Sequence, residues 1–241
     1  MPVSPPRSRR GLSLRPPWHH LSVCSGFQLG EFNILIDKRQ MYDHDTRIHL
    51  LMRGPGIAPG STFPYLGTQV DLAPTWLGLA GLPKPPTMDG RSIAPLLLAA
   101  DAPGLPAQTK AHVAALAPHG QKAFASTWRD SVFIEYYFND PNTKCHDYPT
   151  EDSHNNFIGV RHLADSEFGD TSYTEYQTGN QADAETNGIQ FDNVDFIEYF
   201  NLTADNWQMK NLWHDPGTTA AQEKLHAILH KWYQCKGDEC P

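Results

Sequence analysis

The carboxyl-terminal half of the chain carries the pattern that most limits its possible folds. Three short segments, at 131–138, 156–163 and 195–202, are rich in aromatic and β-branched residues, which is typical of strands. Residues 218–233 instead repeat apolar side chains at helical spacing. The apolar face of this predicted helix consists of Leu225, Ile228, Leu229 and Trp232. We therefore predict one antiparallel sheet whose apolar face is covered by the helix, which is a stable two-layer arrangement.

The preceding part of the chain, residues 26–100, predicts a strand followed by helices. The apolar run at 48–53 is ended by Gly54-Pro55-Gly56, a pattern that indicates a buried strand meeting a turn. Residues 71–81 predict a helix that Asp71 can cap and Gly81 can end. A second, shorter helix is expected at 93–100.

Three other segments are expected to be irregular. Residues 1–25 are predicted to form a disordered basic tail, because the first 20 residues hold four Arg and no acidic residue and are interrupted by Pro. Residues 101–124 are rich in Ala, Pro and Gly and predict a connector. Residues 165–190 are polar with scattered Gly and predict a loop or an irregular hairpin. We expect 125–241, a small α+β unit, to be the most self-sufficient part of the chain.

Charge and hydropathy narrow the class of partner. The net charge of −8 argues against a general nucleic-acid binder. The chain has no run of 18 or more apolar residues, so no membrane span is predicted. The basic amino terminus is not followed by an apolar segment of signal-peptide length, and the sequence alone leaves the compartment open.

Covalent modification is suggested at two places. Cys235 and Cys240 form a close pair with Gly237 between them, which suits a small disulfide-closed turn; two free thiols are the alternative. The remaining cysteines, Cys24 and Cys145, have no such neighbour. Asn201-Leu202-Thr203 is the only glycosylation sequon, and such triplets also arise by chance.

Several segments carry a family likeness when they are read in order. The first three are Gly26-Phe27-Gln28-Leu29-Gly30-Glu31-Phe32, then Asp37-Lys38-Arg39-Gln40, then Leu50-Leu51-Met52-Arg53-Gly54-Pro55-Gly56-Ile57. The last begins at Asp195-Phe196-Ile197-Glu198-Tyr199-Phe200-Asn201-Leu202. Together they resemble the second half of a sulfatase of the alkaline-phosphatase-like superfamily, with the closest likeness to the N-acetylglucosamine-6-sulfatase branch. The resemblance covers about residues 26–240.

This resemblance implies a fold and a function. It implies an α/β fold in which 26–100 are the end of the sulfatase α/β domain, followed by a small antiparallel sheet packed with a carboxyl-terminal helix. The parent family hydrolyses sulfuric esters of sulfated sugars, glycosaminoglycans among them, uses Ca²⁺, and is lysosomal or secreted. Lys38 corresponds to the family lysine that contacts the sulfate group; an ordinary surface lysine in a loop is the alternative.

The groups that the family uses for catalysis are missing from this sequence. It contains neither the Cys/Ser-x-Pro-x-Arg motif that yields the formylglycine nucleophile nor an Asp-Asp pair. Cys24-Ser25 stands where the family has its later metal-binding pair, and Gln28 replaces a family histidine. We therefore expect a fragment of a sulfatase that is inactive alone, has no catalytic residue of its own and binds no Ca²⁺. A non-catalytic binding or interaction module, an arylsulfatase and a phosphodiesterase of the same superfamily are the alternatives.

Other polar residues favour structural roles. We predict no zinc site, because nine histidines show neither His-x-x-x-His nor His-Glu-x-x-His spacing. These are His19, His20, His44, His49, His112, His119, His146, His154 and His162. Acidic residues beside His146 and His154 (Asp147, Glu151 and Asp152) offer cation ligands, but a solvated loop is favoured. Glu135 and Tyr136 resemble a family strand near the sugar pocket, and a structural role is favoured there too.

Overall fold

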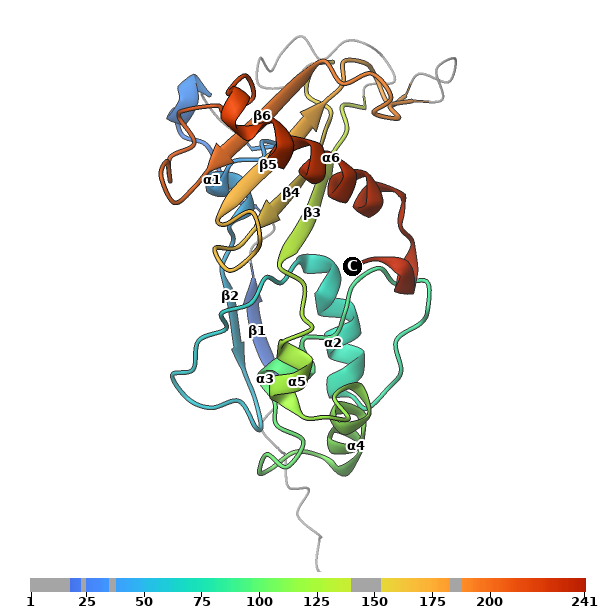
Figure 1. Cartoon of the computed structure of the whole chain (residues 1–241). Coiled ribbons are helices and arrows are strands. Elements are labelled where there is room, and N and C mark those ends of the chain that lie inside the picture. Colours follow the sequence, from blue (N-terminus) through green and yellow to red (C-terminus); the bar gives the residue numbers. More distant parts are fainter. Residues whose placement is uncertain (1–17, 23–24, 35–37, 140–152, 183–187) are drawn as a thin grey trace, which may run out of the picture.

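A four-stranded antiparallel sheet and a long helix form the carboxyl-terminal part of the protein. The computed structural model describes residues 18–22, 25–34, 38–139, 153–182 and 188–241. The strands are β3 (Ser131–Tyr136), β4 (Phe157–His162), β5 (Thr171–Tyr176) and β6 (Phe196–Asn201), and they lie in sequence order. Helix α6 (Thr219–Gln234) crosses one face of the sheet (Figure 1). The predicted small sheet with a carboxyl-terminal helix is confirmed.

The face of the sheet under α6 holds the largest apolar cluster. Alternate residues of the strands point to this face, since successive side chains of a strand lie on opposite sides. Its buried members are Ile158, Val160, Tyr173, Ile189, Phe191, Tyr199, Leu225 and Leu229. Of the four predicted helix contacts, Leu225 and Leu229 are fully buried, whereas Ile228 and Trp232 are half-buried.

The opposite face of the sheet is covered by residues from the first half of the chain. Met41 packs with Phe157 and Tyr176 in a second cluster. Helix α1 (Asp43–Thr46) follows directly. Gly159 admits Met41, because a Cβ atom at this position would lie 3.0 Å from its sulfur. The sheet therefore lies between α6 and the segment 38–47, and its strand β5 is buried along its whole length.

For 165–190 a loop or an irregular hairpin was predicted, and the loop is wrong, because this range contains the strand β5. The strand reads Thr-Ser-Tyr-Thr-Glu-Tyr, so it has high β-propensity but no clean alternation of apolar and polar residues. Both of its faces are covered by distant segments, and this removes the pattern by which a half-exposed strand is recognised.

Helices and a two-stranded ribbon form the rest of the protein, below the sheet in Figure 1. Strands β1 (His19–Ser22) and β2 (Leu50–Arg53) pair antiparallel. The helices are α2 (Leu72–Leu79), α3 (Ala94–Leu97), α4 (Ala107–Leu116) and α5 (Gln121–Ala125). Short 3₁₀ turns lie at Glu31–Asn33, Gln69–Asp71, Pro216–Thr218 and Gly237–Glu239. The predicted strand at 48–53 and the helices at 71–81 and 93–100 are therefore present, with shorter bounds.

Two expectations of irregular structure do not hold. Residues 19–22, predicted as disordered tail, form β1; residues 1–17, 23 and 24 lie outside the described residues. The predicted connector 101–124 contains α4 and most of α5. Thr109 and Val113 of α4 are buried, and Val113 belongs to the apolar cluster that also holds Leu79 of α2. Ala-rich sequence here encodes a packed helix, as its helix propensity allows.

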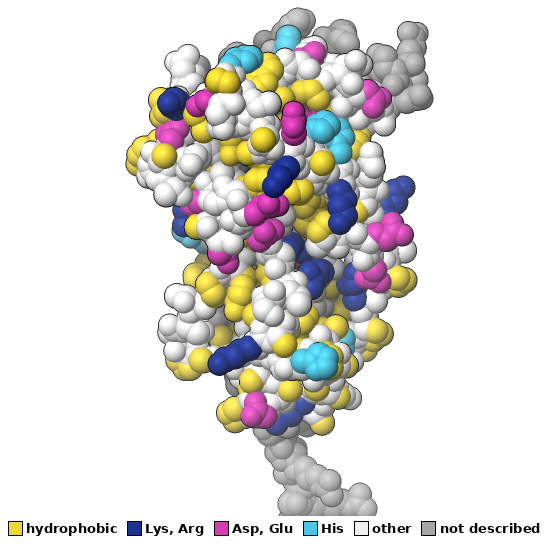
Figure 2. All heavy atoms as spheres, viewed as in Figure 1, with side chains coloured by type: hydrophobic (Ala, Val, Ile, Leu, Met, Phe, Trp, Pro, Cys, Tyr) yellow, Lys and Arg dark blue, Asp and Glu magenta, His cyan; other side chains and the backbone are white. Residues whose placement is uncertain are grey.

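Polar contacts join the helical part to the sheet part. Arg129 forms a buried ion pair with Asp71 at the start of α2. Lys84 pairs with Asp238 at 2.5 Å beyond the end of α6. Figure 2 shows Lys, Arg, Asp and Glu side chains gathered along the middle of the molecule, between the two parts. The predicted unit 125–241 thus shares contacts with 26–100, and the predicted boundaries remain a prediction.

The carboxyl terminus is closed by a disulfide between Cys235 and Cys240. The enclosed Gly237 has a positive φ of 59°, and its amide donates a 2.6 Å hydrogen bond to Asp89. A Cβ atom at Gly237 would lie 2.1 Å from the carbonyl oxygen of Pro86, so only glycine fits. Within the described residues, none of the helices has both the length and the apolar character needed to cross a bilayer.

Candidate functional site

The segment that contains Lys38 is organised around Asp45. The Asp45 carboxylate accepts a 3.0 Å hydrogen bond from the Gln28 side-chain amide and another of 3.0 Å from the backbone amide of Gln40. Its backbone carbonyl accepts from Gly26 at 2.8 Å. Gln28 and Asp45 are both buried. The structure therefore brings together two segments, around Gly26 and around Gln40, that the sequence analysis singled out.

Lys38 is half-buried in this loop. Its ammonium group lies 5.9 Å from the centre of the Phe27 ring, within the range of a cation–π contact. The next residue, Arg39, adopts a left-handed φ of 85°, which is costly for a residue with a side chain. Asn155 donates a 3.0 Å hydrogen bond to the Arg39 carbonyl and ties the loop to the sheet part. Asp37 lies outside the described residues.

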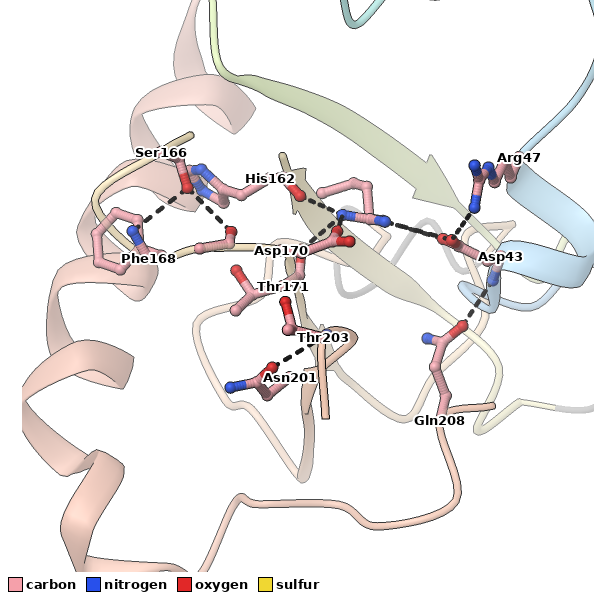
Figure 3. Close-up of polar contacts among 12 residues, drawn as sticks. Asp43, Arg47, His162, Ser166, Phe168, Asp170, Thr171, Asn201, Thr203 and Gln208 are labelled. Carbon is pink, nitrogen blue, oxygen red and sulfur yellow. Dashed lines mark hydrogen bonds and ion pairs between the residues drawn. The ribbon is translucent and has the colours of Figure 1, made fainter. Parts of the chain in front are cut away.

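A cavity of about 300 Å³ lies beside α1, and a buried arginine forms part of its wall. Arg161 of β4 contacts Asp43 at 3.0 Å and Asp170 at 2.5 Å. Figure 3 shows Asp43 and Asp170, which come from different parts of the chain, together with Gln208, which accepts from the Asp43 amide at 2.7 Å. Burial alone would lower the pKa of Arg161, but the two carboxylates outweigh it and raise that pKa. Arg161 therefore stays charged and holds α1 against the sheet.

Two further titratable groups are buried in the sheet. Glu198 accepts 2.8 Å hydrogen bonds from the hydroxyl groups of Tyr42 and Tyr176. Burial raises the pKa of Glu198 despite these hydrogen bonds, which act to lower it. Burial lowers the pKa of His162, whose ring packs edge-on against Phe168 at 5.0 Å. These groups fix the position of the segment 38–47 and the core of the sheet.

A second polar cluster, missed by the sequence analysis, lies under α6. Glu175 of β5 is fully buried and contacts both His226 and His230 of α6. The prediction of no zinc site rested on nine other histidines and left out His226 and His230, which stand four residues apart. The spacing of the two histidines can be read from the sequence. Their carboxylate partner Glu175 cannot, because residues 165–190 were expected to form a loop or an irregular hairpin.

The other predicted site residues occupy varied positions. Asn201 ends β6, is exposed, and accepts hydrogen bonds from the amides of Thr203 and Ala204 at 3.1 and 3.2 Å. Glycosylation at Asn201 remains a prediction. Glu135, on the edge strand β3, accepts a 2.9 Å hydrogen bond from Tyr137. Several residues lie outside the described part of the chain: Cys24, Cys145, His146, Asp147, Glu151 and Asp152.

Comparison with known proteins points to one group of enzymes. Residues 30–108 match the family described as N-sulphoglucosamine sulphohydrolase, C-terminal. N-acetylglucosamine-6-sulfatase from Capra hircus is 31% identical over 234 residues, which is 90% of this chain and 34% of the relative. The extracellular sulfatase SULF-1 homolog from Drosophila melanogaster is 45% identical over 110 residues, 46% of this chain and 8% of the relative.

Two solved structures share the fold. One, determined in complex with its substrate D-glucosamine-2-N,6-O-disulfate, superimposes with a TM-score of 0.59 at 24% identity and covers 88% of this chain and 33% of its own. A sulfatase structure from Bacteroides fragilis gives a TM-score of 0.58 at 15% identity, over 90% of this chain and 35% of its own. The chain thus spans about a third of the length of the N-acetylglucosamine-6-sulfatase and of the two solved structures.

Proposed function

We propose that this chain, which is related to the carboxyl-terminal part of the sulfatases, forms the part that contacts the substrate in an enzyme that hydrolyses sulfuric esters of sulfated sugars. N-acetylglucosamine 6-sulfate is the proposed type of substrate. The observation that carries the proposal is the similarity over 90% of the chain to N-acetylglucosamine-6-sulfatases. The relatives named as extracellular sulfatases favour a secretory compartment.

Lys38 is the residue proposed to contact the sulfate group. An ammonium group is a compact charge that suits a tetrahedral oxyanion. The hydrogen bonds that Asp45 accepts from Gln28 and Gln40 fix the course of the loop on which Lys38 lies. Such support from neighbouring groups is what a binding residue needs to keep its geometry.

The residues of this chain do not fit the Ca²⁺ ion of the family. Calcium prefers carboxylate, carbonyl and amide oxygens. The donors at the corresponding position are the thiol of Cys24 and the hydroxyl of Ser25, which are poor ligands for this ion. We therefore propose that the polypeptide does not hydrolyse sulfate esters by itself and that the nucleophile and the metal ligands come from another segment.

The first test is an assay of the purified chain. Aryl sulfates and N-acetylglucosamine 6-sulfate, supplied with Ca²⁺, are expected to be hydrolysed at the background rate. Turnover above background that Lys38→Ala abolishes would contradict the proposal that the nucleophile and the metal ligands come from another segment.

A chimera tests the proposed function directly. Residues 26–241 would replace the matching part of a characterised N-acetylglucosamine-6-sulfatase. We expect the chimera to retain turnover, and Lys38→Ala to lower its kcat/KM by about 10- to 100-fold, the usual loss of one hydrogen bond to a charged group. Lys122→Ala, at an exposed position of α5, is the matched control and should change kcat/KM by less than about 2-fold. Equal kcat/KM values for both variants would refute the role of Lys38.

A non-catalytic interaction module is the second candidate, and exposed apolar residues favour it. Leu21 and Leu51 are cross-strand partners on the β1–β2 ribbon, and each is 61% exposed. Leu29 is 75% exposed nearby in the sequence. Leu50, Met52 and Trp76 are half-buried, whereas Leu79 is buried.

We expect the isolated chain to self-associate through this apolar surface, because exposed apolar patches usually mark contacts. Light scattering coupled to size exclusion should report species larger than a monomer, and a dye for apolar surfaces should bind. The double variant Leu21→Ser with Leu51→Ser should reduce both signals. A monodisperse monomer without dye binding would argue against an uncovered interface.

A further inference from the structure

The strand β5 and the helix α6 together present three groups that are typical metal ligands. The carboxylate of Glu175 points from the sheet toward α6. Its Oε1 lies 2.6 Å from Nδ1 of His226, and its Oε2 lies 2.8 Å from Nε2 of His230. The three donor atoms all lie within 4.8 Å of one another. One carboxylate and two imidazoles thus converge from two elements on one point.

The helix presents both rings on the same side. His226 and His230 are four residues apart, so one turn of α6 places them next to each other, with ring centres 4.2 Å apart. Two histidines at this spacing together with a carboxylate from elsewhere in the fold make a typical Zn²⁺ ligand set. We propose that Glu175, His226 and His230 bind a zinc-type transition metal ion, with a remaining position open to water.

The geometry requires only a small adjustment to accept the ion. Ligand atoms at about 2.0 to 2.1 Å from a tetrahedral zinc are about 3.3 Å apart. The present separations of 2.6 and 2.8 Å are those of hydrogen bonds, so the ion would take the place of the protons between carboxylate and rings. The side chain of His226 is 53% exposed and can move outward, while Glu175 is fixed in the core.

The residues around the cluster support metal binding in two ways: one orients the carboxylate, and others line an adjoining cavity. The hydroxyl of Tyr173 donates a 2.8 Å hydrogen bond to Oε1 of Glu175, which orients the carboxylate in the way that outer partners orient metal ligands. A cavity of about 500 Å³, lined in part by Glu175, Glu223 and His226, adjoins the cluster. This cavity gives an ion a route from solvent and leaves room for a bound water. In Figure 2, histidine side chains reach the surface over α6.

The proposed site is independent of sulfate-ester chemistry. Glu175 lies on the face of the sheet under α6, whereas the segment 38–47, which begins with the proposed sulfate contact Lys38, covers the opposite face. A metal ion here would join β5 to α6 and thereby stabilise the folded chain by mass action. Loss of the ion should therefore lower thermal stability without removing Lys38 from its loop.

The test is metal binding by the whole chain after removal of metal with a chelator. We expect equilibrium dialysis at pH 7.5 to show one Zn²⁺ bound per chain beyond that of the double variant His226→Gln with His230→Gln. At a Zn²⁺ concentration of about 100 times Kd, the Tm of the wild type should rise by about 5 to 10 °C. Co²⁺ should give the visible absorption of a tetrahedral site, and millimolar Ca²⁺ should not displace it, because imidazole nitrogen is a poor calcium ligand.

Two further variants keep the result interpretable. His119→Gln, at an exposed position after α4, should bind Zn²⁺ as the wild type does. His226→Gln alone changes a half-exposed side chain and should fold, yet lower Zn²⁺ affinity at least 10-fold. Equal Zn²⁺ affinity in the wild type and in the His226→Gln variant would overturn the proposal. So would a wild type that binds no Zn²⁺, which would leave the cluster as an ion pair of histidine and carboxylate.

Discussion

Replacing Arg161 with Gln should lower the free energy of unfolding by about 3 kcal/mol, near the lower end of the loss seen when one partner of a buried ion pair is removed. The Arg161 side chain is 11% exposed, and its partners Asp43 and Asp170 are 17% and 30% exposed. Without the guanidinium, Asp170 would lose this partner and Asp43 would keep, among the described residues, only the exposed Arg47 at 3.9 Å. Urea unfolding followed by tryptophan fluorescence measures the loss.

A second substitution separates charge from shape at this position. Asp43→Asn combined with Arg161→Gln removes one of the two carboxylates that lose the guanidinium and should recover about 1 kcal/mol or more relative to Arg161→Gln alone. The buried network would then be repaired in part by an amide pair. If Arg161→Gln differs from the wild type by less than about 0.5 kcal/mol, the ion pairs do not hold α1 on the sheet.

Truncation of Leu229 to Ala should cost about 3 kcal/mol and ranks with the loss at Arg161. Leu229 has no exposed surface and belongs to the cluster between α6 and the sheet. Removing its isobutyl group forfeits buried apolar area and leaves a cavity that the surrounding aromatic rings cannot fill. Thermal and urea unfolding of the same variant should agree on the size of the loss.

Ile228 offers a matched control one residue earlier on the same helix. It is half-buried, so Ile228→Ala removes less buried apolar surface and should cost about 1 kcal/mol. Similar losses for Ile228→Ala and Leu229→Ala would contradict the assignment of the loss at Leu229 to packing on the sheet, because both substitutions introduce the residue of highest helix propensity.

The parts of the fold that the sequence predicts are those with a local pattern. Strands β3, β4 and β6 and helix α6 each show apolar periodicity within their own residues. Strand β5 does not, because its polar face is buried by the segment 38–47 and its other face by α6. Helix α4 was hidden by the Pro and Gly residues that precede and follow it. Both cases depend on tertiary burial, which no short window of sequence contains.

The candidate sites also depend in part on contacts between residues that are far apart in the sequence. Lys38 was found from a short motif, and its role remains a proposal. The ion pair of Asp43 with Arg161 joins residues 118 positions apart, so only the fold reveals it. The pair of His226 and His230 was present at a recognisable spacing. The pair becomes a candidate metal site only through the register of β5, which places Glu175 beneath the helix.

The burial of the sheet between an early and a late segment has a consequence for biosynthesis. Asp43 leaves the ribosome 118 residues before its partner Arg161. At roughly 5–20 residues per second, this interval lasts roughly 6–24 s. During that time Met41 has no sheet to pack against, so its apolar side chain stays uncovered on the nascent chain. Closure of such a long loop is slow, and the docking of 38–47 should be the last event in folding.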